Sequence, residues 1–98
     1  MADEASNRIV LITGASAGLG DAFARAFAAR GRHLALVARR VDRLETLAEA
    51  LARQYGTRSL VIGCDLGRYG AEAEVLGAVD AAGLQVETLV NNAGYSIP

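Results

Sequence analysis

The sequence contains no lysine and no tryptophan, and its 98 residues include one cysteine, Cys64, and one proline, Pro98. The absence of lysine excludes a phosphate-binding loop of the Walker type, which needs a lysine followed by serine or threonine. A single cysteine excludes an intramolecular disulfide and is compatible with a reducing compartment, so we expect a cytoplasmic protein. We interpret Cys64 itself as a small, buried hydrophobic residue in a strand.

The chain also lacks long apolar runs and clusters of like charge. Its aliphatic run at 9–12 is far shorter than the about 20 residues of a membrane helix. The acidic start "MADEASN" differs from a secretory signal. The net charge is −1, and the ten arginines are spread along the chain. We therefore expect neither a membrane nor a nucleic-acid partner, and we assign no metal ligand.

Hydrophobic residues make up 52% of the chain, in short apolar segments that alternate with amphipathic ones. This alternation predicts strands and helices in turn, within a single small domain. After a flexible tail of residues 1–7, we expect strands over 8–13, 33–38, 58–64 and 86–91, and helices from about 19 to Gly31, from about Asp42 to Gly56 and over 69–82.

The order βαβαβαβ is typical of a doubly wound parallel sheet, the Rossmann-like α/β fold. If strands one, two and three step in one direction, right-handed crossovers place the first two helices on one face of the sheet. We expect the fourth strand to return beside the first, which gives the strand order 3-2-1-4 and places the third helix on the other face. The strand order reverses between the first and fourth strands, where the carboxyl ends open a crevice for ligands. We expect Gly14 and Asn91, at the ends of these two strands, to meet there.

The apolar faces of the helices are predicted from residues spaced three and four apart. They are Leu19, Ala22, Phe23, Ala26 and Phe27 in the first helix, Leu44, Leu47, Ala48 and Leu51 in the second, and Val75, Leu76 and Val79 in the third.

Three glycines mark the first strand-to-helix turn, in "LITGASAGLG" at 11–20. Gly14 lies where the strand must turn, and Gly18 and Gly20 lie where the helix begins. A helix N-terminus offers unpaired N–H groups and partial positive charge to a phosphate, and glycine lets the backbone approach it. Ser16 adds a hydroxyl donor. A tight turn without a ligand remains the alternative interpretation.

Three motifs together resemble the short-chain dehydrogenase/reductase family: "TGASAGLG" (13–20), "CDL" (64–66) and "NNAG" (91–94). The resemblance extends from about residue 8 to 98. It implies the N-terminal part of a Rossmann dinucleotide-binding domain, truncated before its active site, in an oxidoreductase that transfers a hydride between NADP(H) and a carbonyl or alcohol.

The same resemblance implies a set of cofactor-binding residues. Asp65 would accept a hydrogen bond from the adenine amino group, although an aspartate that only caps the following turn is the alternative. For Asn91 and Asn92, at the end of the fourth strand, a role as turn residues only is likewise the alternative. The complete set is Gly14, Ser16, Gly18, Leu19, Gly20, Arg39, Arg40, Asp65, Leu66, Asn91, Ala93 and Gly94.

In that family, the residue at the end of the second strand selects the cofactor. An acid there would accept hydrogen bonds from the adenosine ribose and repel a 2′-phosphate. Here Ala38 takes that place, and Arg39 and Arg40 follow it. Guanidinium groups pair bidentately with phosphate, so we predict NADP(H) rather than NAD(H). Two solvated arginines at the start of a helix are the alternative.

The family's catalytic residues are a serine and a tyrosine within Tyr-x-x-x-Lys. A chain without lysine cannot carry that motif, so we assign no catalytic residue. For the full-length protein we expect a small carbonyl or alcohol substrate and a homo-oligomer. A non-catalytic NADP(H)-binding or regulatory module is the alternative function. Because the fourth strand would be an exposed edge, we expect the 98-residue chain to be marginally stable or self-associating.

Overall fold

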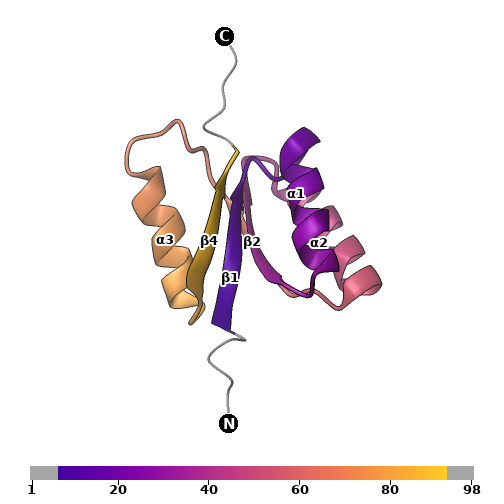
Figure 1. Ribbon diagram of the computed structural model, residues 1–98. Coiled ribbons are helices and arrows are strands. Elements are labelled where there is room, and N and C mark those ends of the chain that lie inside the picture. The colour runs from indigo at the N-terminus through magenta and orange to yellow at the C-terminus, as the bar shows by residue number, and fades with distance from the viewer. Residues whose placement is uncertain (1–6, 93–98) are drawn as a thin grey trace.

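Four short apolar segments form one parallel sheet in the computed structural model, which describes residues 7–92 (Figure 1). The strands are β1 (Arg8–Thr13), β2 (His33–Ala38), β3 (Ser59–Gly63) and β4 (Gln85–Asn91), and the helices are α1 (Gly18–Ala29), α2 (Val41–Tyr55) and α3 (Ala71–Ala81). All seven predicted elements are confirmed. The predicted tail, 1–7, lies outside the described residues except for Asn7.

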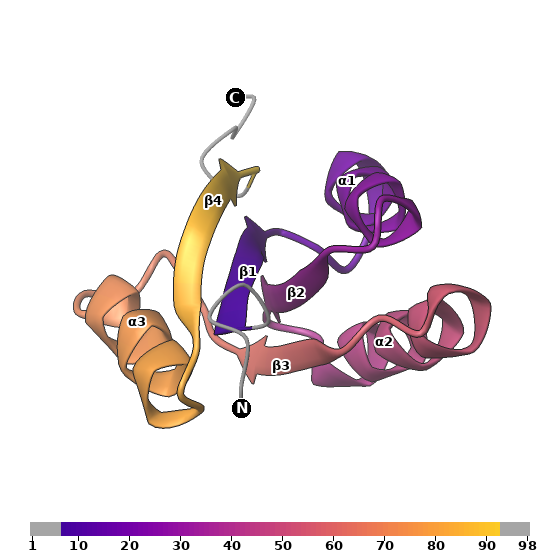
Figure 2. The same cartoon turned by 60° about the horizontal axis from the view of Figure 1, so that its bottom comes forward.

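The strand order is β3-β2-β1-β4, and every neighbouring pair is parallel. This confirms the predicted doubly wound, Rossmann-like topology. Helices α1 and α2 cover one face of the sheet and α3 covers the other (Figure 2). Because all strands run in one direction, their carboxyl ends lie along one edge of the sheet, and each strand-to-helix turn begins there.

The aliphatic residues of β1 alternate between the two layers. Val10 and Ile12 pack in the cluster with α1 and α2, whereas Ile9 and Leu11 pack in the cluster with α3. Both sides of the strand are therefore buried, which explains its uninterrupted apolar sequence. In α2 the predicted face is confirmed, with Leu44, Leu47 and Leu51 buried and Ala48 half-buried.

The predicted apolar face of α1 was wrong in part. Its buried residues are small (Gly20, Ala24 and Ala28), and the large Phe23 and Phe27 are half-buried beside them. Leu19, Ala22 and Ala26 are exposed. Small residues let the helix backbone lie close to the sheet, so the side of α1 that faces the sheet consists of small residues rather than large ones. In α3, Leu76 is likewise exposed, and Ala71 is buried with Val75 and Val79.

An irregularity between β1 and β4 was not predicted from the sequence. Ile9 aligns with Val86 and Val10 with Thr88, so Glu87 is an extra residue on β4. Its carboxylate pairs with Arg8 at 3.5 Å and also with Arg32. The extra residue thus presents a carboxylate to two arginines from different parts of the chain, and links β4 to them at the amino end of the sheet.

Cys64 is free and buried, as predicted, but it directly follows β3 instead of lying in the strand. Its thiol lies 3.9 Å from the carbonyl oxygen of Ala71, at the start of α3. Among the described helices, none is both long enough and apolar enough to cross a membrane.

Candidate nucleotide-binding site

The turn from β1 into α1 needs glycine at two kinds of position. Gly14 and Gly18 have φ angles of 63° and 59°, in the left-handed region that side chains rarely adopt. Gly20 is different, because a Cβ there would overlap the carbonyl oxygen of Gly14 and lie 2.7 Å from its carbonyl carbon. The first turn of α1 can therefore approach the end of β1 only with glycine at position 20.

The first turn of α1 lacks a capping side chain. The N-cap residue is Ala17, whose extended backbone is followed by Gly18, and it makes no side-chain cap hydrogen bond. A helix start without a side-chain cap leaves N–H groups that water or an anion must satisfy. This start lies at the carboxyl edge of the sheet, where the chain leaves β1 (Figure 1).

Hydrogen bonds join the end of β4 to the end of β1. The Thr13 hydroxyl donates to Oδ1 of Asn91 at 3.2 Å and lies 3.4 Å from the carbonyl oxygen of Val90. Nδ2 of Asn92 donates to the carbonyl oxygen of Gly14 at 3.2 Å. The threonine–glycine and asparagine motifs are separated by more than 70 residues, yet they share these bonds, as the predicted meeting of Gly14 and Asn91 requires.

The two arginines after β2 differ in their partners. Arg40 pairs with Asp42 through two hydrogen bonds, from Nε at 3.2 Å and from Nη2 at 3.0 Å. The hydrogen bond from Arg40 lowers the pKa of Asp42, and the same bond raises the pKa of Arg40. The Arg39 side chain is exposed and makes no hydrogen bond or ion pair within residues 7–92. One guanidinium is thus engaged and the other is available.

Asp65 lies at the end of β3 with an exposed side chain. Its Oδ1 accepts a hydrogen bond from the backbone N–H of Gly67 at 2.9 Å. This bond is the turn cap that the sequence left open as an alternative, and it occupies one of the two carboxylate oxygens. The neighbouring Leu66 is half-buried and packs against the cluster beneath α3.

A cleft of about 810 Å³ runs over the carboxyl ends of all four strands. It brings together many of the residues that the sequence predicted: Gly14, Ser16, Arg39, Arg40, Asp65, Leu66 and Asn91. Gly18, Leu19 and Gly20 do not line it. Instead, Gly18 and Gly20 shape the turn beside it and Leu19 is 59% exposed. Ala93 and Gly94 lie outside the described residues.

Other residues of the site were not in the predicted set. Thr13, Asn92 and Asp42 act by contacting predicted residues. Thr13 and Asn92 belong to two of the quoted motifs, and Asp42 marked the predicted start of the second helix, but none was assigned to the site. Part of the cleft lining is apolar and comes from β1, α3 and β4. This part consists of Leu11, Val75, Leu76 and Leu89.

The sequence model of the short chain dehydrogenase family matches residues 8–98. The chain belongs to this family. The chain is 43% identical over 89 residues to sulfoacetaldehyde reductase 2 of Chromohalobacter salexigens. That match covers 91% of this chain and 34% of the relative. The chain spans about a third of the length of the curated relatives it matches.

Solved structures of short-chain dehydrogenases share the fold. L-sorbose reductase from Gluconobacter frateurii, in complex with NADPH and L-sorbose, superposes with a TM-score of 0.83 at 38% identity, covering 90% of this chain and 34% of that one. A metagenomic short-chain oxidoreductase in complex with NADP gives a TM-score of 0.80 at 32% identity, covering 92% and 40%. The chain therefore has the nucleotide-binding fold of an oxidoreductase family.

Proposed function

We propose that the chain binds NADP(H) in the cleft at the carboxyl edge of the sheet, in preference to NAD(H). The observation that carries this proposal is the pair of exposed arginines after β2, which line the cleft. An acidic residue at the end of this strand would bind the ribose hydroxyls and repel a 2′-phosphate. The available guanidinium of Arg39 is the principal 2′-phosphate ligand, and Arg40 lies beside it. The complexes of two similar proteins with NADPH and NADP support the same cofactor.

The residues around the turn fit the rest of such a ligand. The pyrophosphate would lie at the uncapped start of α1, where Gly14, Gly18 and Gly20 hold the turn and Ser16 offers a hydroxyl. Leu19 begins the same helix. No protein side chain competes for this helix start among the described residues, so the site fits an anion.

The adenosine half of the ligand would lie across the ends of β2, β3 and β4. Leu66 would contact the adenine, and the carboxylate oxygen of Asp65 that does not cap the turn would accept from its amino group. Asn91 would lie beside the ribose, and Ala93 and Gly94, outside the described residues, complete that motif.

In the full-length protein the bound cofactor supplies or accepts a hydride, and we infer a small carbonyl or alcohol as substrate, as in L-sorbose reductase. The 98 residues contain no lysine, so no catalytic role is assigned to any of them. A cytoplasmic location accords with the single free cysteine, and a homo-oligomer is proposed for the full-length protein.

Titration calorimetry of the chain with 2′,5′-ADP and with 5′-AMP tests the cofactor. The parent chain should prefer 2′,5′-ADP, and Arg39→Ala should reduce that preference about tenfold, because a charge-assisted hydrogen bond contributes about 1.5 kcal/mol. Arg53→Ala is the matched control, since it removes an equal charge at the far end of α2. Equal binding of the two nucleotides by the parent chain would refute the assignment.

A further inference from the structure

The start of α2 brings a carboxylate next to the proposed 2′-phosphate site. Arg40 is the N-cap residue of α2, and its carbonyl oxygen accepts hydrogen bonds from the N–H groups of Arg43 at 3.1 Å and Leu44 at 3.2 Å. Asp42 follows two residues later in the first helical turn. The helix start therefore sets the backbone positions of both partners of the Arg40–Asp42 pair.

The end of β3 also restricts this helix start. A Cβ on Gly63 would overlap a methyl group of Val41, so Val41 packs directly on the glycine backbone. The Thr46 hydroxyl donates to the carbonyl oxygen of Asp42 at 3.0 Å. These contacts hold Val41, which lies between the two partners, and the backbone of Asp42.

The Arg40–Asp42 pair takes up hydrogen-bond donors of Arg40 that a phosphate could otherwise use. Nε and Nη2 of Arg40 donate to the two different oxygens of the Asp42 carboxylate. A phosphate recognised bidentately by Arg40 would need two such parallel donors. The Asp42 carboxylate therefore occupies one bidentate edge of the guanidinium and places a negative charge beside it.

We propose that Asp42 sets the cofactor selectivity by occupying Arg40, so that the 2′-phosphate is held mainly by Arg39. This inference rests on the proposed NADP(H) site and assigns unequal roles to its two arginines. Asp42 acts as an internal competitor of the 2′-phosphate. A chain with Arg40 released would discriminate more strongly between the phosphorylated and unphosphorylated nucleotides.

The test compares the affinity ratio of 2′,5′-ADP to 5′-AMP by titration calorimetry in matched variants. Asp42→Asn should raise the ratio about threefold, the size expected when an exposed ion pair is released. In the parent chain, Arg40→Ala should lower the ratio less than Arg39→Ala does. In the Asp42→Asn background, Arg40→Ala should lower the ratio more than it does in the parent chain. In the Arg40→Ala background, Asp42→Asn should have no effect.

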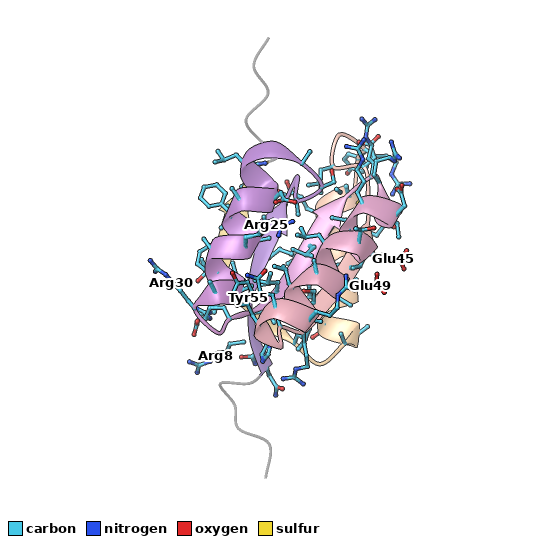
Figure 3. The ribbon with its side chains drawn as sticks, turned by 90° about the vertical axis from the view of Figure 1, so that its right-hand side faces the viewer. Arg8, Arg25, Arg30, Glu45, Glu49 and Tyr55 are labelled. Atoms are coloured by element: carbon cyan, nitrogen blue, oxygen red, sulfur yellow. The ribbon has the colours of Figure 1, made fainter. Side chains whose placement is uncertain are left out.

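Glu45→Gln is the matched control, because it removes an equal charge from the exposed side of the same helix (Figure 3). Glu45 makes no hydrogen bond to Arg40. An equal gain from Glu45→Gln would show a general charge effect and overturn the inference. Asp42→Ser provides a second release of Arg40 that keeps a residue favoured at helix starts, and circular dichroism verifies that each variant is folded.

The two proposals fail in different ways. If the parent chain prefers 2′,5′-ADP and Arg39→Ala removes the preference, but Asp42→Asn leaves the ratio unchanged or lowers it, only the role of Asp42 is overturned. A gain from Asp42→Asn that persists in the Arg40→Ala background also overturns it, since Asp42 would then act on the phosphate directly. A parent chain without preference overturns both proposals.

Discussion

The backbone of Gly14 fills the space that a side chain at Gly20 would occupy. The carbonyl carbon of Gly14 lies 2.7 Å from the position that a Cβ of Gly20 would take. The two glycines are in contact although they perform different tasks. Gly14 turns the chain with a positive φ, and Gly20 lets the helix approach that turn. Gly14 is thus required by its backbone conformation and Gly20 by packing, whether or not a phosphate is bound.

Gly20→Ala should therefore destabilise the fold. The added methyl group meets rigid backbone rather than a movable side chain, so we expect a loss of about 1–3 kcal/mol in the free energy of unfolding, together with weaker nucleotide binding. Urea denaturation measures the first effect. Gly77→Ala in α3 is the control, because its Cβ meets nothing within 4 Å. That variant should be stabilised by about 0.5–1 kcal/mol, and an equal loss in both variants would contradict the packing argument.

Thr13→Val should loosen the joint between β1 and β4. The substitution keeps the shape of the buried side chain but removes the hydroxyl that donates to Asn91. We expect the free energy of unfolding to fall by about 1 kcal/mol, and nucleotide affinity to fall with it. Thr88→Val on β4 is the matched control, since the Thr88 side chain makes no hydrogen bond within residues 7–92. No difference between the two variants would show that the hydroxyl is unimportant.

Folding stability should decrease as the pH falls below about 6.5. Nδ1 of His33 accepts a hydrogen bond from the N–H of Arg58 at 3.0 Å, which only an unprotonated nitrogen can do. Burial, and then the charge of Arg58, lower the His33 pKa below 6.5 in the folded state. The unfolded chain consequently binds a proton at higher pH than the folded chain, and stability is lost from about pH 6.5 down to the lowered pKa.

Urea midpoints measured between about pH 7.5 and pH 5.5 test this dependence, because carboxylates titrate mostly below that window. The parent chain should lose stability on acidification, and His33→Gln should lose less. A His33→Gln variant with the same pH dependence as the parent would assign the effect to other groups.

The 98-residue chain should self-associate through the outer side of β4. This strand is at the edge of the described sheet, and Leu89 on it and Leu76 on α3 are 57% and 55% exposed. An unpaired edge with apolar side chains favours intermolecular pairing. Leu89→Lys should reduce the apparent mass in light scattering, whereas Tyr69→Lys, at a fully exposed residue in the loop before α3, should not. A monomeric parent chain that melts cooperatively would contradict this prediction.

Local patterns in the sequence were enough to predict the fold. The aliphatic strands, the alternation with amphipathic helices and the handedness of crossovers lead to the order β3-β2-β1-β4 once the first three strands step in one direction and the fourth returns beside the first. The motifs at the strand ends also predicted that Gly14 and Asn91 would lie together. These features depend on short-range periodicity and on chirality, which are properties of the chain itself.

Only the tertiary structure decided which side chains face each other. It placed Leu19 and Leu76 in solvent. In α1 the buried residues are Gly20, Ala24 and Ala28, whose small side chains let the helix approach the sheet. The tertiary structure also paired Arg40 with Asp42 and left Arg39 available. The sequence alone does not distinguish these two adjacent arginines. Such choices depend on distances between elements, which are set by packing rather than by periodicity.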